Sequence, residues 1–372
     1  MATPNHLLNT SWTSHRLSPL HHSKEHASIL TNLSALQTYA TRLRDHLTNS
    51  FADAQGYRAD EDLSTGSGLA TIGTLQSCTW EPVSTLSFLN PGQELQEDQD
   101  PAGLLITLSY ETTTYKAALL APPTAQGSQE KSSKPRKRTR ASTGGSSSNS
   151  TYLPLLLTKL PKPLRESFLA FLSANFDAYV SVLKISSAAL CEVLEGYVSS
   201  LTSISSAAGS SAEPEGLIED VIREMHLTLA FAPPIAPLLK TLNVNVPRET
   251  FGKFLRASES DSGGGKGRSV LSGLTAYLQE HLALDVRFPV PGSSDGSGSS
   301  LVGGYVKLTR VACSGFVVTG EGRVKVVAKG LGEGEGKEEG DERNRGALRG
   351  GEALLRALLG RAVAGVERGG ES

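Results

Sequence analysis

The chain has 372 residues, of which 38% are hydrophobic, and its formal net charge is −2 at pH 7. This nearly neutral balance excludes a strong overall electrostatic attraction to nucleic acid or to anionic membranes. The three cysteines form no CxxC pair, which favours unpaired thiols in a reducing compartment, and the sequence shows neither a signal-peptide pattern nor a run of 18 apolar residues that would span a membrane.

Residues 7–20 are the first distinctive feature along the chain. They include Trp12, one of only two tryptophans, between leucine-rich flanks. One interpretation of Trp12 is an exposed partner anchor, because tryptophan is enriched in interface hot spots. The flanking leucines favour the other interpretation, in which Trp12 pins the N-terminal segment into the core against the first helix.

Residues 24–47 have the spacing of an amphipathic helix. Apolar residues recur at intervals of four and three, which places them on one face. They are Ile29, Leu33, Leu36, Ala40, Leu43 and Leu47. A strand is predicted over residues 71–80. Residues 104–110 and 115–120 are apolar, with β-branched and aromatic members, and they predict a β-hairpin.

Residues 122–151 lose this periodicity and are rich in Ser, Gly, Lys and Arg, which predicts a disordered linker. The linker contains a basic run made of Lys134, Arg136, Lys137, Arg138 and Arg140. Nuclear import receptors bind short runs of this kind. The alternatives are a solubilising charge cluster and, less favoured, direct contact with nucleic acid. The linker separates an N-terminal α+β region, residues 1–121, from a C-terminal one, residues 152–372.

The C-terminal region is predicted to combine helices and strands, separated by Gly/Ser-rich segments. Apolar spacing indicates helices at residues 164–183, 187–201, 248–255, 270–282 and 347–366. Alternating or β-branched runs indicate strands at residues 153–157, 225–231, 240–246, 284–290, 305–311, 315–319 and 323–329. A turn at Gly320-Glu321-Gly322 is expected to join the last two strands.

The opening string Leu7-Leu8-Asn9, followed by Trp12-Thr13 and Ser18-Pro19-Leu20, resembles the start of the centromere protein L family. The resemblance implies an α+β fold with a large curved, mostly antiparallel sheet, covered by helices and interrupted by long disordered insertions. It also implies a non-enzymatic structural subunit of the inner kinetochore, located in the nucleus at the centromere. Such a subunit forms a heterodimer with a centromere protein N-like partner and acts as a scaffold in chromosome segregation and cell division. Its contact with chromatin would be mainly indirect, and no cofactor, metal, small-molecule substrate or membrane is expected.

An enzyme with an active site in a cleft between the two α+β regions is the alternative function. Three features were candidates for chemistry, and each has a simpler explanation. His22 and His26 have a spacing that suits a shared metal, but no third ligand follows. Residues 262–269 lack the Ser or Thr that follows the lysine of a phosphate loop. Cys191 lies on an apolar helix, where its thiol should be inert.

The last predicted hairpin is the candidate for partner binding. It comes late in the chain before an acidic Gly/Glu insert, so it is expected to be an outer strand pair of the sheet. The resemblance points to the same region, because family members pair through the C-terminal part of the sheet. The predicted interface residues are Phe316, Val318, Val324 and Val326. The alternative is that all four side chains face the intramolecular core.

Overall fold

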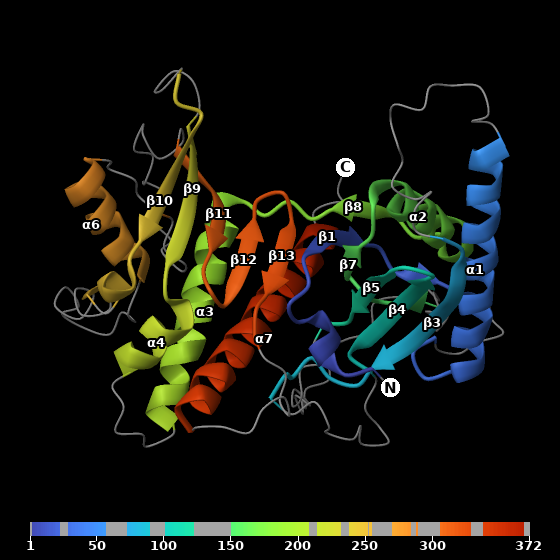
Figure 1. Cartoon of the computed structure of the whole chain (residues 1–372), viewed down its shortest axis with the longest axis horizontal. Coiled ribbons are helices and arrows are strands. Elements are labelled where there is room, and N and C mark those ends of the chain that lie inside the picture. Colours follow the sequence, from blue (N-terminus) through green and yellow to red (C-terminus); the bar gives the residue numbers. More distant parts are fainter. Residues whose placement is uncertain are drawn as a thin grey trace, which may run out of the picture.

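The computed structural model describes residues 2–22, 29–56, 73–89, 101–122, 150–207, 214–231, 238–251, 253–254, 270–283, 288, 306–328 and 338–367. These residues form an 11-stranded antiparallel sheet in the order β10-β9-β11-β12-β13-β1-β7-β5-β4-β3, with β8 paired to β1 (Figure 1). Helices pack against the sheet, which confirms the predicted α+β class.

The N-terminal half of the sheet contains β1 (Trp12–Leu17), β3 (Leu75–Val83), β4 (Gly103–Tyr110), β5 (Thr114–Leu120), β7 (Leu155–Lys159) and β8 (Val180–Val182). The predicted hairpin is confirmed, because β4 and β5 pair in register from Gly103↔Leu120 to Ser109↔Thr114. Helices α1 (Leu33–Gly56) and α2 (Lys162–Phe176) cover one face of this half. A separate two-stranded sheet joins β2 (Leu20–His21) to β6 (Ser150–Thr151).

Two of the predicted helices have different ends in the structure, for local reasons. Helix α1 begins only at Leu33, where the Asn32 side-chain oxygen accepts a hydrogen bond from the N–H of Ala35 at 3.1 Å. This is a typical N-cap contact. Helix α2 ends at Phe176 rather than at residue 183, because Asp177 adopts a left-handed conformation with φ 49°. The chain then turns back and β8 pairs with β1.

The C-terminal half of the sheet contains β9 (Met225–Phe231), β10 (Thr241–Val246), β11 (Val306–Ala312), β12 (Phe316–Thr319) and β13 (Arg323–Val326). Its helices are α3 (Ser187–Ala207), α4 (Pro214–Ile222), α6 (Val270–Leu282) and α7 (Glu338–Glu367). Helix α7 therefore starts nine residues before the predicted residue 347. The predicted strand at residues 284–290 lies outside the described residues, apart from Phe288.

The sheet has an apolar core on each face. One core lies under α1 and α2, and the other lies between the sheet and helices α3, α4, α6 and α7. Strand β1 joins the two halves, because it pairs with β7 on one side and with β13 and β8 on the other. One continuous sheet therefore runs through both predicted α+β regions.

Trp12 belongs to the core on the side of α3 and α7, not to the core under α1. Its side chain is 3% exposed, and its indole N–H donates to the Leu7 carbonyl at 3.0 Å. Leu7 closes a short 3-10 helix, η1 (Pro4–Leu7), whose apolar side chains join the same core. The interpretation in which Trp12 pins the N-terminal segment is therefore confirmed, with a different packing partner.

Candidate interaction surfaces

The predicted partner-binding hairpin, β12–β13, lies in the middle of the sheet. Strand β13 pairs with β12 on one side and with β1 on the other, where Trp12 faces Val324. The four predicted interface side chains are at most 2% exposed and belong to the core under α3 and α7. They are Phe316, Val318, Val324 and Val326.

The expectation that β12–β13 is an outer strand pair is therefore wrong. The physical reason is long-range pairing: the N-terminal strand β1 covers the edge that β13 would otherwise expose. In this conformation the four side chains have almost no surface to offer a partner. A role for them in direct partner contact would require this core to open.

The remaining sequence candidates are buried or lie outside the described residues. The basic run from Lys134 to Arg140 and the Gly-rich residues 262–269 are outside them. His22 is buried, and no cluster of three or more metal-ligating side chains occurs within the described ranges. Burial raises the pKa of the Cys191 thiol to about 12, with the charge of Glu195 adding to the effect, so this cysteine is inert at neutral pH.

The sheet ends at two strands, β10 and β3, which differ in their surroundings. Helix α1 packs along β3 (Figure 1). Strand β10 pairs with β9, and no other strand of the described residues pairs with its outer side. Leu238 and Leu239, which precede β10, are 98% and 44% exposed. The β10 edge is thus an unpaired strand edge with exposed leucines beside it.

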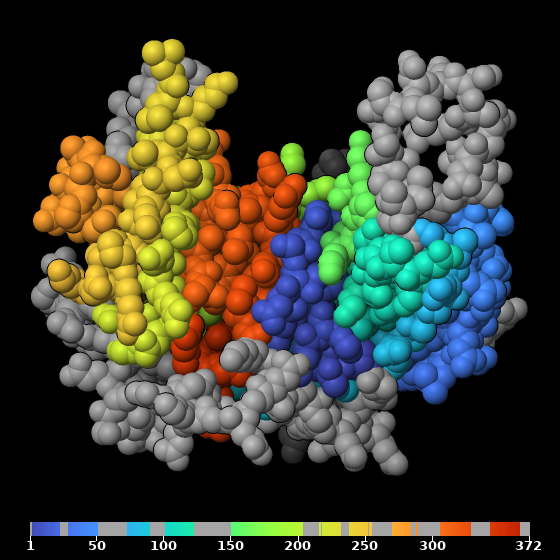
Figure 2. Space-filling model, in the orientation of Figure 1, coloured from blue at the N-terminus to red at the C-terminus, as the bar shows by residue number. Residues whose placement is uncertain are grey.

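The C-terminal half of the sheet leaves its second face uncovered, and this face is basic. We call it the open face: the side of β9–β13 opposite the core under α3 and α7 (Figure 2). The five strands contain no aspartate or glutamate. The cations that they place on the open face are Lys307, Arg310, Arg323 and Lys325.

The neutral side chains on this face are mostly polar. Thr228 and Asn243 lie across from each other on β9 and β10, and the threonine hydroxyl donates to the asparagine side-chain oxygen at 2.9 Å. Glu224, just before β9, lies 3.8 Å from His226 on β9, at the end of the strand. A flat polar surface with several cations and no strand carboxylates suits an anionic partner.

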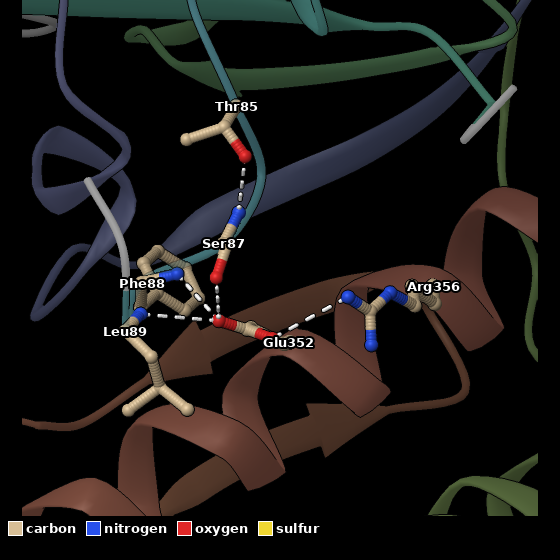
Figure 3. A network of polar contacts seen from close by, with 6 residues as sticks. All are labelled: Thr85, Ser87, Phe88, Leu89, Glu352 and Arg356. Carbon is tan, nitrogen blue, oxygen red and sulfur yellow. Dashed lines mark hydrogen bonds and ion pairs between the residues drawn. The ribbon is translucent and has the colours of Figure 1, made fainter. Parts of the chain in front are cut away.

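A buried carboxylate connects the N-terminal half to α7 (Figure 3). Glu352 is 5% exposed, and its Oε1 atom accepts hydrogen bonds from the Ser87 hydroxyl at 2.8 Å, the Phe88 N–H at 2.6 Å and the Leu89 N–H at 3.2 Å. Arg356 donates to the Oε2 atom at 3.4 Å. The segment that follows β3 is thus held on the helix that covers β12 and β13.

A second set of polar contacts holds the other end of α7. The Arg16 guanidinium on β1 donates to the carbonyls of Ala362 and Arg361 at 3.2 and 3.3 Å. Arg361 forms an ion pair with Glu192 on α3. Helix α7 is therefore fixed at both ends to elements far away in the sequence, which makes the uncovered surfaces of the sheet rigid platforms.

Nothing in this arrangement points to chemistry. The polar side chains described above hold elements together or face solvent. None of the helices in the described part of the chain combines the length and apolarity needed to cross a bilayer.

Comparison with known proteins agrees with this structural character. No curated protein matches the chain at a significant level. A family model described as centromere protein L matches residues 6–363 of the 372-residue chain. The match therefore covers both halves of the sheet and nearly all of α7. The chain belongs to the centromere protein L family, a structural family of the inner kinetochore that is not known as enzymatic.

Proposed function

We propose that this protein is an inner-kinetochore scaffold that forms a heterodimer with a centromere protein N-like subunit through the free edge of β10. One observation carries the proposal: β10 ends the sheet and is paired only with β9 among the described strands. A partner strand extends such an edge by main-chain hydrogen bonding. The family resemblance also supports the C-terminal part of the sheet as the pairing region. The heterodimer would act at centromeres in the nucleus, in chromosome segregation.

The register of β9 and β10 defines which main-chain groups are available. The Phe231 N–H donates to the Lys240 carbonyl at 3.0 Å. In an antiparallel pair, hydrogen-bonded residues alternate with residues whose N–H and C=O groups point away. Starting from Lys240, the outward-pointing residues of β10 are Thr241, Asn243 and Asn245. These three residues offer the N–H and C=O groups that a partner strand needs.

The side chains near this edge support an apolar contribution. Val244 and Val246 face the core, whereas Leu242 is only half-buried. Leu238 and Leu239 lie at the same end of β10 and expose most or nearly half of their surface. A long unpaired edge next to exposed leucines is an aggregation hazard for a free chain. Covering it with an obligate partner would remove that hazard.

A proline substitution tests the edge without damaging the β9–β10 pair. Asn243→Pro removes an N–H that points away from β9, so the hairpin should keep its own hydrogen bonds. The variant should fold with a nearly unchanged thermal midpoint and lose co-purification with the centromere protein N-like subunit. Asn243→Thr keeps the N–H and is the matched control. Normal co-purification of a folded Asn243→Pro variant would sink this interface.

The open face supports a second candidate function, direct contact with DNA phosphates. The supporting observation is the charge pattern of β9–β13, in which four Lys and Arg residues occur with no carboxylate. Phosphate contacts of this kind are independent of base sequence and depend on salt. This contact would add to the indirect contact with chromatin that the partner provides.

Charge reversal distinguishes direct from indirect contact. The double change Lys307→Glu and Lys325→Glu should weaken binding of the purified heterodimer to duplex DNA and lower the salt slope by about 0.9 per lost phosphate contact. The control is Lys162→Glu with Lys184→Glu, two exposed lysines outside the open face. Equal losses in both double variants would indicate a nonspecific charge effect and no dedicated face.

A further inference from the structure

A pocket of about 350 Å³ lies where α4, the β11–β12 turn and the first turns of α7 meet. Its volume is at the lower end of the roughly 300–1,000 Å³ typical of ligand pockets, so it suits one or two side chains rather than a whole helix. The residues that line it are Asn9, Val221, Ser314, Gly315, Val327, Ala328, Arg343, Asn344 and Ala347. It is separate from both the β10 edge and the open face.

The walls of the pocket are held in place by hydrogen bonds between distant segments. The Asn9 side-chain amide donates to the Ala328 carbonyl at 2.7 Å. Ser314 ties the β11–β12 turn to the end of α4, because its hydroxyl donates to the Val221 carbonyl at 2.5 Å. The Val327 N–H donates to the Gly315 carbonyl at 2.8 Å. The pocket is thus preformed, and little ordering is required on binding.

The chemistry of the pocket combines an apolar floor with a cationic rim. Alanine and valine side chains make up the apolar part: Val221, Val327, Ala328 and Ala347. Arg343 is the one charged residue among those that line the pocket, and within the described part of the chain it forms no ion pair. Burial lowers the pKa of its guanidinium, and the Arg223 cation adds to this effect, while Asp220 opposes it.

The charge around Arg343 is unbalanced. Arg248 also contributes positive charge there, but its own carboxylate partners are Asp220 at 2.5 Å and Glu219 at 3.9 Å. Asp220 is therefore already engaged by Arg248, and Arg343 lacks a close carboxylate of its own. A carboxylate from outside would complete this site by a charge-assisted hydrogen bond to the guanidinium.

We propose that this pocket is a docking site for a short acidic–apolar peptide segment of a binding partner. An apolar side chain of the peptide would occupy the floor, and a neighbouring Asp or Glu would pair with Arg343. The occupant is defined by charge complementarity: the rim is cationic, the floor is apolar, and the rigid walls have room for no more than one or two side chains. The site does not depend on the proposed β10 interface.

A selection from a phage library of random 12-residue peptides, with the full chain as bait, tests this proposal. We expect enriched peptides in which an apolar residue lies next to Asp or Glu. The best synthetic peptide should lose affinity by about tenfold or more on Arg343→Glu. Ala347→Phe, which fills the floor, should have a similar effect. Arg349→Glu, an exposed arginine of α7 that does not line the pocket, should leave affinity within about twofold.

Three results would overturn the proposal. They are no enrichment, enriched peptides without acidic residues, and binding that is unchanged by Arg343→Glu while the variant keeps its thermal midpoint. The chain's own Glu333 and Glu335 follow β13 in sequence and are the competing occupant. If only the Glu333→Ser and Glu335→Ser variant selects peptides, the pocket belongs to that segment and not to a partner.

Discussion

The N–H of Phe88 donates to the Glu352 carboxylate at 2.6 Å, across 264 residues of sequence. Phe88 itself is fully buried against the core that α7 covers. The contact therefore supplies a buried main-chain donor with a charged acceptor and positions an apolar side chain at the same time. It links the segment after β3 to the helix that supports the C-terminal half of the sheet.

We expect Glu352→Ala to destabilise the protein by roughly 2–4 kcal/mol, because three donors lose their acceptor inside the protein. Arg356→Ala removes only the partly exposed ion pair and should cost less than about 1 kcal/mol. Urea unfolding of both variants measures the difference. Equal effects would mean that the hydrogen bonds from residues 87–89 contribute little.

Trp12→Ala should cost about 3–5 kcal/mol, since the side chain is a large buried member of the core. Leu33→Ala, at a position that is 67% exposed, is a control that should change stability by about 0.5 kcal/mol or less. Thermal unfolding measures both. A stable Trp12→Ala variant that fails to bind a partner would instead support the exposed-anchor interpretation.

His15 should make the protein less stable in mild acid. It is 2% exposed, its Nε2 atom lies 3.1 Å from the Thr158 hydroxyl, and burial, with a smaller contribution from Arg165, lowers its pKa to about 4. The unfolded chain, with a histidine pKa near 6.5, then binds the proton more tightly than the folded chain. This contribution to stability is complete above about pH 6.5 and decreases by up to about 3 kcal/mol as the pH falls toward 4.

Unfolding in urea at about pH 7 and about pH 4.5 separates His15 from the other titrating groups. His15→Gln cannot be protonated, so the wild-type protein should lose more stability than the variant between these two pH values. Parallel losses in the two proteins would show that His15 does not control the acid response.

Nuclear entry should depend on the basic run of the linker. Replacing all five of its cations with alanine should reduce nuclear accumulation of a tagged protein in non-dividing cells. The residues to replace are Lys134, Arg136, Lys137, Arg138 and Arg140. Imaging in the Asn243→Pro background removes import on a bound partner. An unchanged nuclear signal in that background would favour the solubilising role.

Local patterns in the sequence predict several elements correctly, because those elements depend on neighbouring residues. The alternation in residues 104–120 gives the β4–β5 hairpin, and the Gly-Glu-Gly turn gives β12–β13. Strand β8 was missed because the apolar spacing of α2 continues past Asp177, where a left-handed residue ends the helix. Nothing local indicates that β1 pairs with β13, and this missing contact is why the hairpin was expected at an edge.

The buried carboxylate was also missed, although the sequence contains a weak signal for it. Glu352 falls on the same helical face as Leu348, Leu355 and Leu359, three residues of the core. An acidic residue on an apolar face indicates a buried acceptor, but the donors come from the distant segment after β3. The outward main-chain groups of β10 are likewise defined by register, which side-chain patterns do not contain.

Hydrogen exchange with and without the centromere protein N-like subunit tests the central claim most directly. In the free protein, the amides of Thr241, Asn243 and Asn245 point away from β9 and should exchange rapidly. Addition of the partner should slow exchange at these three amides more than anywhere else in the sheet. Strong partner binding with unchanged exchange along β10 would contradict the account and place the interface elsewhere.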